Sequence, residues 1–309
     1  MPAISVIMPA FNSQETISRA VESFRYQTFP DWELIIIDDG STDNTPHILD
    51  DLAAADSRIK VIHKPNGGVA SARQVGIESA MGEYSIHADS DDWVETDMLE
   101  KMYTTAKRTN ADMVVADFFI NYPDGRQEIR RQKLDSYYPC DVIYQLYAKD
   151  LFGGLWHKLL RTAIYTKAKV SFEARIDFCE DKLLLTKILY RCPDIKIVYH
   201  PKAFYHYMQT PISITRKISH HSFECMKRFH EMLPQYLPDE PRFTTVRKTE
   251  SLKMFLNGFI YNIFTTDEIS REFSKVKPQA YKTQSIRWLI GYLCIDLHLY
   301  KIARLFIKY

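Results

Sequence analysis

The stretch LIIIDDGSTD, residues 34–43, places four aliphatic residues directly before a polar turn. An uninterrupted apolar run of this length predicts a strand that is buried on both faces, as in a parallel sheet. Two carboxylates then stand at the carboxyl end of that strand, where parallel α/β sheets bind their ligands. The stretch therefore predicts both a sheet and a binding site at its edge.

Apolar runs and helical patterns alternate throughout the first 120 residues. This alternation predicts successive βα units and hence an α/β fold with a Rossmann-like, mostly parallel sheet flanked by helices. Thr45 before Pro46 is typical of a helix whose cap is Thr45. A polar stretch at residues 121–133 predicts a hairpin or a flexible excursion. The expected strands are residues 4–8, 34–37, 59–62, 84–88 and 113–118, and the expected helices are residues 14–26, 46–55 and 69–80.

The last third of the chain, residues 216–309, has a helical pattern. None of it reaches the roughly 20 consecutive apolar residues that a membrane-spanning helix needs. Residues 285–309 are nevertheless dense in apolar side chains and carry several Lys and Arg. Two interpretations stay open for them: a helix that lies on a membrane surface, or one that packs on the catalytic domain or on a second subunit.

Composition narrows the class of protein. A chain of 309 residues with 46% hydrophobic and 26% charged residues can bury a sizeable core. Its 40 basic and 39 acidic residues give a net charge of +1, which provides no field for nucleic acid. Five cysteines without a CxxC pair indicate neither a disulfide framework nor a zinc site. With no signal-peptide pattern at the start, we expect a cytoplasmic protein.

Two polar clusters follow the first strands. Asp38 and Asp39 can accept hydrogen bonds from a nucleobase NH or from ribose hydroxyls, although a helix-capping loop has the same composition. In residues 66–73, Gly68 permits close backbone approach at a helix start that favours an anion. Arg73, one turn inside, can reach a phosphate or hold a neighbouring carboxylate. An ordinary glycine turn with a solvated Arg is the alternative there.

A third cluster, Asp89-Ser90-Asp91-Asp92-Trp93, also follows an expected strand. Carboxylates two residues apart in an extended segment point to one side, so Asp89 and Asp91 can share a divalent cation and its bridging diphosphate. Both Mn²⁺ and Mg²⁺ accept such oxygens. Three neighbouring acids repel one another, and a cation would relieve that repulsion. The alternative is a solvated acidic turn.

Taken together, these pieces resemble a family 2 glycosyltransferase with the GT-A fold, of the bacterial surface-polysaccharide type. The resemblance rests on residues 5–12 with Glu15, and on residues 38–43, 66–73 and 89–93. It implies a catalytic domain at residues 1–215, with a nucleotide-sugar half at 1–120 and an acceptor-side half at 121–215. Residues 216–309 would then be a helical C-terminal region.

The resemblance also implies roles for individual residues. Asp39 would contact uracil, Asp91 would ligate the metal, and His206 would be a further metal ligand or a diphosphate contact. A packed, hydrogen-bonded His206 is the alternative. The residues implied in binding the donor nucleotide are Pro9, Phe11, Glu15, Asp38, Asp39, Gly68, Arg73, Asp89 and Ser90.

On the acceptor side, the resemblance selects Asp181 as general base, with Glu180 beside it. Acidic residues also simply suit a helix start. The family often has a glycine just before this acid pair, where this chain has Cys179. The remaining acceptor-side residues are Asp92, Trp156 and Lys158, of which Trp156 equally suits a core and Lys158 could approach the diphosphate. Residues 213–216 resemble the part that closes over the donor.

The predicted activity is metal-dependent, inverting transfer of a sugar from a UDP-sugar to an acceptor hydroxyl. The acceptor would be a lipid-linked saccharide in bacterial surface-polysaccharide assembly, at the inner face of the membrane. A nicotinamide dehydrogenase is disfavoured because residues 9–12 hold no GxGxxG loop, and a nucleotidyltransferase because no basic glycine-rich loop follows the first strand. A catalytically silent nucleotide-sugar binder or assembly partner remains open, and the sequence predicts no oligomeric state.

Overall fold

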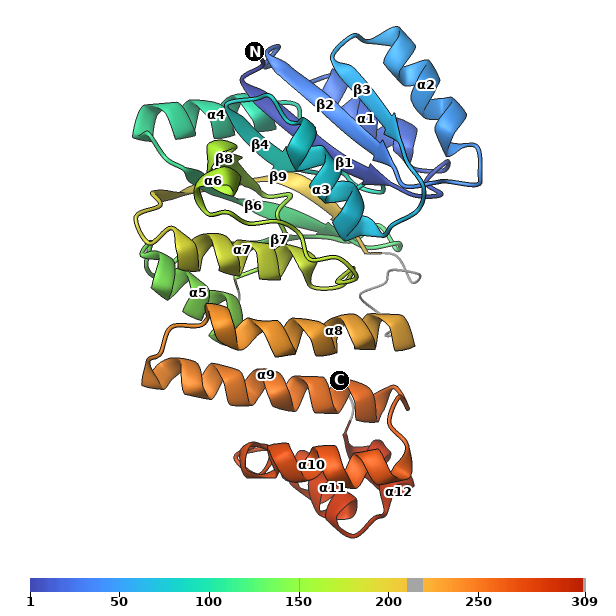
Figure 1. Ribbon diagram of the computed structural model, residues 1–309, viewed down its shortest axis with the longest axis vertical. Coiled ribbons are helices and arrows are strands. Elements are labelled where there is room, and N and C mark those ends of the chain that lie inside the picture. Colours follow the sequence, from blue (N-terminus) through green and yellow to red (C-terminus); the bar gives the residue numbers. More distant parts are fainter. Residues whose placement is uncertain (150, 210–218, 308–309) are drawn as a thin grey trace. The chain divides into compact units, whose positions relative to one another are not determined.

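The computed structural model describes residues 1–149, 151–209 and 219–307, and the chain divides into two compact units, Met1–Pro211 and Ile212–Tyr309 (Figure 1). The described strands of the first unit are β1 Ile4–Ala10, β2 Trp32–Asp38, β3 Ile59–His63, β4 Tyr84–His87, β5 Trp93–Val94, β6 Met113–Asn121, β7 Gln127–Arg130, β8 Lys158–Arg161 and β9 Ile197–Met208. Its helices are α1 Ile17–Arg25, α2 Thr45–Ala55, α3 Val69–Ser79, α4 Met98–Thr109, α5 Pro139–Ala148, α6 Ala163–Lys167 and α7 Glu180–Arg191.

All these strands join one sheet, in the order β3-β2-β1-β4-β8-β6-β9-β5, with β7 beside β6. The run β3-β2-β1-β4 is parallel throughout, and β6 pairs with β9 in parallel. Between these two parts, β8 runs antiparallel to both β4 and β6. The predicted α/β fold with helices flanking the sheet is confirmed, and the parallel βα units lie where the apolar runs predicted them.

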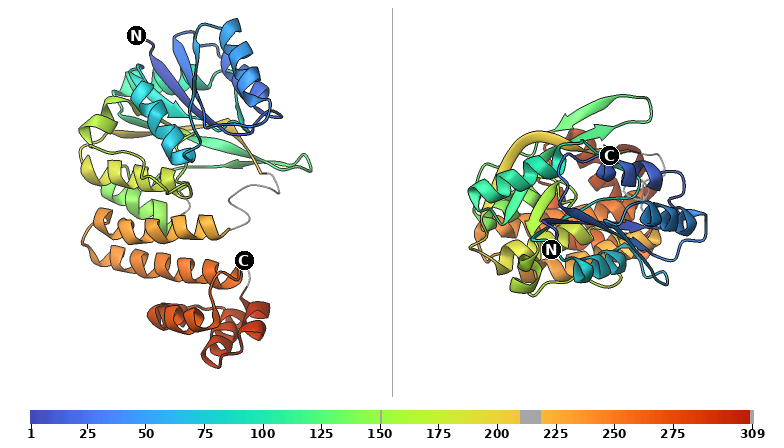
Figure 2. Two further views of the ribbon diagram at one scale, coloured as in Figure 1. Left: turned by 45° about the vertical axis from the view of Figure 1, so that its right-hand side comes forward. Right: turned by 90° about the horizontal axis from the view of Figure 1, so that it is seen from above.

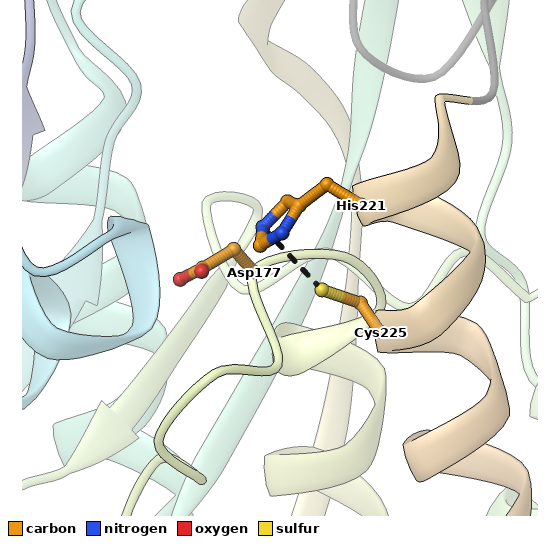
Figure 3. A group of neighbouring side chains, drawn as sticks. All are labelled: Asp177, His221 and Cys225. Carbon is orange, nitrogen blue, oxygen red and sulfur yellow. Dashed lines mark hydrogen bonds between the residues drawn. The ribbon is translucent and has the colours of Figure 1, made fainter.

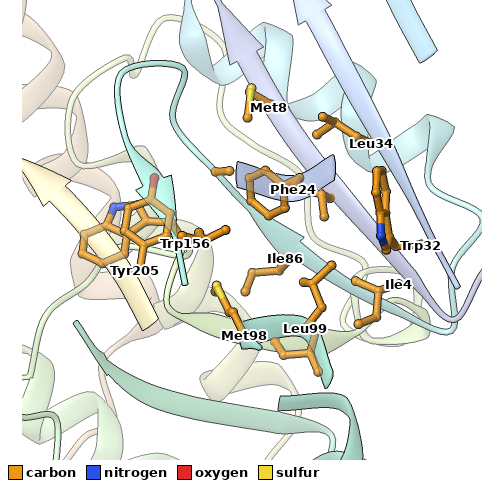
Figure 4. Close-up of a cluster of buried hydrophobic side chains, with 14 of the residues drawn as sticks. Ile4, Met8, Phe24, Trp32, Leu34, Ile86, Met98, Leu99, Trp156 and Tyr205 are labelled. Carbon is orange, nitrogen blue, oxygen red and sulfur yellow. The ribbon is translucent and has the colours of Figure 1, made fainter. Parts of the chain in front are cut away.

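Both faces of the sheet are covered, which explains the uninterrupted apolar runs of β1 and β2. Every residue of these two strands is buried. On one face, Ile4 and Leu34 pack with Phe24 of α1 and Leu99 of α4 (Figure 4). On the other face, alternate strand residues pack against Ala72 of α3. Side chains of a strand alternate between faces, so a strand covered on both sides must be apolar at every position.

One predicted helix boundary is wrong by one residue. Thr45 is the first residue of α2 and Asn44 stands before it, without a capping hydrogen bond from its side chain. The Thr45 hydroxyl instead accepts a hydrogen bond from the Ser13 backbone N–H at 2.8 Å. The Thr45 hydroxyl oxygen, which the sequence pattern predicts to cap α2, therefore binds the loop after β1 instead.

The polar stretch after β6 is a hairpin, one of the two forms predicted for it. Tyr122 N–H donates to the Arg126 carbonyl at 2.9 Å, and Gly125 has a φ of 85° that favours glycine. The strands β6 and β7 extend together from the sheet (Figure 2), and all four residues of β7 are exposed.

The second unit is helical in its described part and has a core of its own. Phe255, Phe273 and Tyr292 are among the side chains that form this core. One turn apart on α8, His221 Nε2 lies 3.6 Å from Cys225 Sγ (Figure 3). None of the helices in the described ranges is both long and apolar enough to cross a bilayer. The elements are α8 His220–Met232, the 3₁₀ turn η1 Leu233–Tyr236, α9 Pro241–Ile260, α10 Thr266–Ala280, α11 Ile286–Asp296 and α12 Tyr300–Phe306.

Candidate active site

The predicted clusters meet at one edge of the sheet because neighbouring parallel strands end together. Ala10 of β1 is paired with Asp38 of β2, and β4 runs parallel to β1 on its other side. The loop after β1 also reaches the acidic turn after β4, where Ser13 Oγ and Ser90 Oγ lie 2.8 Å apart. Three polar segments that are far apart in sequence therefore share this edge.

Asp38 organises the turn in which it lies. Its Oδ1 accepts the Ser41 N–H at 3.0 Å, and its Oδ2 lies 2.7 Å from His63 Nδ1. Burial raises the pKa of this carboxyl, but the hydrogen bonds from Ser41 and His63 outweigh burial and leave the pKa below its ordinary value. Asp38 is therefore held as a carboxylate whose partners are protein groups.

Asp39 joins the first cluster to the second. Its Oδ1 accepts the Gly67 N–H at 3.0 Å, its Oδ2 accepts the Gly68 N–H at 2.8 Å, and Lys64 Nζ forms an ion pair with it. Gly40 is required beside it because a Cβ there would stand 2.7 Å from the Asn66 backbone nitrogen. The uracil contact stays a prediction, since the structure uses this carboxylate to close the glycine turn.

The end of β1 and the loop after it contain three of the predicted donor contacts. Pro9 is buried, whereas Phe11, with half of its surface exposed, and Glu15 are open to solvent. Asn12 was missed by the sequence analysis: it adopts a φ of 48°, and its side-chain oxygen accepts the Thr42 N–H at 2.8 Å. Asn tolerates this backbone region better than most residues, and its position between two expected elements was the available signal.

The anion predicted at the start of α3 is supplied by the protein itself. The Asp177 carboxylate accepts the Ala70 N–H at 3.1 Å. Gly68, with a φ of 86°, leaves the space for it, because a Cβ at that position would clash with Asp177. The glycine turn is therefore bound to the loop that precedes α7, a pairing of residues 107 positions apart.

Arg73 is the centre of the site. Its guanidinium is buried, and Nη1 forms an ion pair with Asp181 while Nη2 lies 2.8 Å from Asp89 Oδ1 and 3.8 Å from Glu180 Oε1. Burial alone would lower the pKa of Arg73, but the three carboxylates raise it above its ordinary value. The sequence predicts that Arg73 either reaches a phosphate or holds a neighbouring carboxylate. In the structure it holds neighbouring carboxylates.

Asp181 is oriented from a second side as well. The Leu155 backbone N–H donates to its Oδ2 at 3.1 Å, and α7 begins immediately before it at Glu180. Cys179, which stands where the family often has glycine, adopts a left-handed φ of 67°. Such a conformation costs a non-glycine residue about 1 kcal/mol. The turn therefore has the backbone shape that glycine would favour, without the glycine.

Comparison with known proteins agrees with this geometry. The profile of Glycosyl transferase family 2 matches residues 5–170. EpsH of Bacillus subtilis, a protein with a provisional glycosyltransferase name, is 30% identical over 304 residues, covering 96% of this chain and 84% of EpsH.

This chain belongs to glycosyl transferase family 2.

Solved structures share the fold of this glycosyltransferase. TarS residues 1–349 of S. aureus, in complex with UDP-GlcNAc, aligns with a TM-score of 0.68 at 19% identity, over 98% of this chain and 90% of TarS. A mannosyltransferase of Pyrobaculum calidifontis, in complex with GDP-Man and Mn²⁺, aligns with a TM-score of 0.57 at 14% identity, over 98% and 86% of the two chains. The GT-A type of α/β fold is thereby confirmed.

The acidic turn of the glycosyltransferase combines an open and a buried carboxylate. Asp91 has an exposed surface, but the protein atoms packed around its carboxyl partly desolvate it and raise its pKa, although Arg19 opposes this. Burial, and after it the nearby Asp91 and Asp181, raises the pKa of Asp89 to about 6 although Arg73 opposes this. Asp92, predicted on the acceptor side, is buried, and its Oδ1 accepts the Met208 N–H at 2.8 Å. Asp92 therefore anchors the turn to β9, whereas Asp89 is half-buried and Asp91 is exposed.

Glu180 is the most strongly perturbed acid whose pKa lies in an accessible range. Burial, together with the adjacent Asp181, raises the pKa of Glu180 to about 8 although Arg73 opposes this. The folded chain therefore keeps a proton on Glu180 that the unfolded chain releases between about pH 4.5 and pH 8. It follows that the stability of the ligand-free protein falls as the pH rises through this window.

We expect the substitution Glu180→Gln to remove this loss. At pH 9 the variant should be more stable than the native chain by about 1 to 2 kcal/mol, since one pKa unit corresponds to 1.36 kcal/mol and part of the shift is shared with Asp181. At pH 5 the variant and the native chain should have equal free energies of unfolding. Urea unfolding at both pH values, without divalent cations, measures the difference. An equal effect at pH 5 and pH 9 would contradict the assignment of the titration to Glu180.

Two acceptor-side residues lie inside the protein. Trp156 is buried and stacks on Tyr205 with ring centroids 4.3 Å apart. Lys158 Nζ, in place of the predicted diphosphate contact, donates to the Phe152 carbonyl at 2.8 Å, the Gly154 carbonyl at 2.6 Å and His157 Nε2 at 2.5 Å. These three acceptors use every hydrogen that the buried Lys158 amino group can donate, and burial holds its pKa well below the ordinary value. Lys158 therefore stabilises the loop at residues 152–155. The Leu155 N–H of this loop donates the hydrogen bond to Asp181.

His206 is packed and hydrogen-bonded. Its ring is stacked against Trp93 at 4.8 Å and Phe119 at 4.5 Å between centroids, and its Nε2 lies 2.9 Å from Glu95 Oε1. Metal ligation by His206 stays a prediction. To bind a cation through Nε2, His206 would have to lose its hydrogen bond with Glu95. The predicted donor-closing segment, residues 213–216, lies outside the described residues.

Arg19 is a functional candidate that the sequence analysis missed. Its Nη2 donates to the Asp91 carbonyl at 2.5 Å, and the guanidinium lies over the Trp93 ring, 4.3 Å from the centroid. The side chain is exposed, in contrast to Arg73 and Lys158. A positive charge beside the acidic turn suits a diphosphate. An arginine within an expected helix gives no signal of its own, because only the fold brings it to Asp91.

Proposed function

We propose that this glycosyltransferase moves a sugar from a UDP-sugar to an acceptor hydroxyl with inversion, using Mn²⁺ or Mg²⁺. The observation that carries the proposal is the guanidinium of Arg73, which contacts both Asp89 and Asp181. One planar group a few ångströms across thus holds the donor-side acidic turn and the start of α7 at the same place. A donor and an acceptor that bind to these two segments would meet there.

The acidic turn fits a hard divalent cation. Asp91 offers an exposed carboxylate, and burial raises the pKa values of both Asp89 and Asp91, with the neighbouring Asp91 and Asp181 adding to the shift at Asp89. Carboxylates are the ligands that Mg²⁺ and Mn²⁺ prefer. When bound, the cation would neutralise charge that builds up on the leaving diphosphate. Arg19 would stabilise the same diphosphate from the α1 side, and Phe11, Glu15 and the glycine turn would bind the nucleoside.

Asp181 would act as the general base. Its two oxygens are oriented by Arg73 and by the Leu155 N–H, and each retains a lone pair that can accept the proton of an acceptor hydroxyl. The activated oxygen then attacks the anomeric carbon from the side opposite to the nucleotide, so a single displacement inverts that centre. Arg73 stays protonated and keeps Asp181 in place throughout.

The donor is tested by release of nucleoside diphosphate from UDP-, GDP- and dTDP-sugars, with Mn²⁺, with Mg²⁺ and with a chelator. The TarS complex with UDP-GlcNAc supports a UDP-sugar as the donor. Because the mannosyltransferase complex contains GDP-Man, GDP-sugars are the donors to compare with it. Metal-dependent turnover of UDP-sugars alone agrees with the proposal. Turnover that the chelator leaves unchanged contradicts the metal site, and a preference for GDP-sugars contradicts the donor.

We expect Asp91→Asn to raise the Mn²⁺ concentration for half-maximal turnover by about 100-fold, because an amide oxygen is a far weaker ligand than a carboxylate. Turnover at saturating Mn²⁺ should recover in part. A titration of Mn²⁺ against turnover measures this, with Asp97→Asn as a control outside the acidic turn. Unchanged Mn²⁺ dependence in Asp91→Asn would remove Asp91 from the metal site.

A second candidate function is a silent nucleotide-sugar binder or assembly partner. It would bind a UDP-sugar in the presence of Mn²⁺ and release no UDP with any acceptor. The acid pair Glu180 and Asp181 beside Arg73 favours the enzyme, since metal-dependent binding of the donor would need only the acidic turn.

The acceptor that we propose is a lipid-linked saccharide of bacterial surface-polysaccharide assembly, reached from the cytoplasmic face of the membrane. Support comes from the resemblance described above and from the surface of the second unit. Transfer from the preferred donor to lipid-extracted acceptors, compared with soluble oligosaccharides, tests it. Equal transfer to soluble oligosaccharides would show that the lipid is not required.

A further inference from the structure

The helix α11 is apolar on two faces, of which the second unit covers only one. Gly291, Tyr292 and Ile295 are buried in the core of that unit. On the other face, Ile286, Ile290, Leu293 and Leu297 recur at intervals of four, three and four residues, which places them in one stripe along the helix. A helix that is hydrophobic all round is normally buried all round.

The stripe continues onto α12. Leu299, directly before α12, and Ile302 and Leu305 within it are exposed, while Ala303 and Ile307 are buried. The helices α11 and α12 also pack against each other, since the core of the unit contains residues of both. We call the seven exposed side chains the α11–α12 surface: Ile286, Ile290, Leu293, Leu297, Leu299, Ile302 and Leu305, each exposed by 39% to 75%.

Isolated exposed aliphatic residues are common on proteins, but a contiguous group marks an interaction site. Elsewhere in the described chain, exposed aliphatic side chains such as Met81 and Ile129 stand singly. Seven of them on two adjoining helices, within 20 positions of sequence, require a partner that shields them from water.

The charges around this surface indicate which partner. Within residues 282–307, the exposed side chains that are charged at neutral pH are Lys282, Arg287 and Lys301, all basic. The one acid of that range, Asp296, is half-buried and bonded to Lys277 Nζ at 2.9 Å and to the Tyr281 hydroxyl at 2.6 Å. Every exposed charge within the range that contains the α11–α12 surface is therefore positive.

We propose that the α11–α12 surface binds an anionic lipid bilayer. Aliphatic side chains would enter the boundary between headgroups and acyl chains, while Arg287 and Lys301 would contact anionic headgroups. A second copy of this chain suits the surface less, because a two-fold symmetric contact would bring like charges together. The membrane location in the proposed function rests on this surface, but the argument for the surface does not depend on the reaction.

The test is flotation of the full chain with vesicles of phosphatidylcholine alone and of phosphatidylcholine with phosphatidylglycerol. We expect binding to the anionic vesicles and little to the neutral ones. Leu293→Gln with Leu297→Gln should weaken binding by at least about tenfold, because each replacement removes a buried apolar side chain from the lipid. Arg287→Gln with Lys301→Gln should weaken binding to anionic vesicles and remove its dependence on salt.

Met81→Gln is the matched control, since it changes an equally exposed apolar side chain of the first unit and should bind as the native chain does. Circular dichroism confirms that the exposed replacements leave the fold intact. The proposal is overturned if the native chain ignores anionic vesicles, or if the leucine pair binds them unchanged. It is also overturned if the native chain sediments as a dimer that the leucine pair dissociates while vesicles remain unbound. UDP release without vesicles is a separate readout, so its failure would reject only the reaction.

Discussion

Asp181→Asn is expected to lower kcat by about a thousandfold, within the range that a positioned general base contributes to catalysis. The amide oxygen can still accept the Leu155 N–H, so the start of α7 should keep its place. An amide cannot take a proton from the acceptor hydroxyl. The KM for the donor should change little, because none of the residues proposed to bind the donor in this mechanism is Asp181. Initial rates with the preferred donor and a saturating acceptor measure both parameters.

Two neighbouring acids serve as controls for Asp181. Asp177→Asn changes a carboxylate of the same loop that bonds the Ala70 N–H, and its amide oxygen can keep that bond, so kcat should remain within a few fold. Glu180→Gln separates the adjacent candidates. If Glu180→Gln loses activity as severely as we expect of Asp181→Asn, while Asp181→Asn stays active, Glu180 is the base and the assignment to Asp181 fails.

Arg73→Gln is expected to destabilise the first unit by about 3 to 5 kcal/mol, the usual effect of removing one partner from a buried ion pair. Asp89, Glu180 and Asp181 would lose the cation that they share. Since Arg73 lowers the pKa values of Asp89 and Glu180, its removal raises both further. The loss of stability should therefore be largest above about pH 8, where the carboxylates are ionised, and should shrink toward pH 5 as they take up protons. Urea unfolding across this range measures it.

Arg161→Gln is the matched control for Arg73→Gln. Arg161 also pairs with two carboxylates, Glu83 and Asp112, both at 3.0 Å, but a quarter of its side chain is exposed. Its loss should cost about 1 kcal/mol or less, as for other solvent-accessible pairs. If Arg73→Gln were no more destabilising than Arg161→Gln, or equally destabilising at pH 5 and pH 9, the three carboxylates would not depend on Arg73 for their charge.

Local sequence patterns were sufficient to predict the parallel half of the sheet and the segments that form the site. The apolar runs of β1 and β2 identify strands covered on both faces, and the polar residues that follow them lie at the carboxyl edge. Strand order beyond β4 was not predictable in this way. Lys158 to Arg161 form β8 between β4 and β6, although many residues separate it from both.

Partners across the fold could not be predicted, because no local pattern encodes them. Arg73 and Asp181 are 108 residues apart. The residues next to Arg73 in the sequence are equally compatible with an arginine that binds a phosphate and with one that binds a carboxylate. Lys158 illustrates the opposite case: a lysine in a family-like segment suggests a ligand contact, while only the loop geometry reveals that the hydrogens of its amino group are already donated within the protein. Arg19 approaches Asp91 through the packing of α1 beside the acidic turn.

The helix α3 has a consequence for recombining enzymes of this kind. At its start it is bound to Asp177, and one turn later Arg73 is bound to Asp181, so one short helix near the start of the chain carries two contacts with α7 and the loop before it. A chimera joined near residue 121 would take α3 from one parent and both aspartates from the other. Parents that match at these contact positions should keep both contacts when the segments are exchanged. A parent without arginine at position 73 should leave Glu180 and Asp181 of the other parent without the cation that they share.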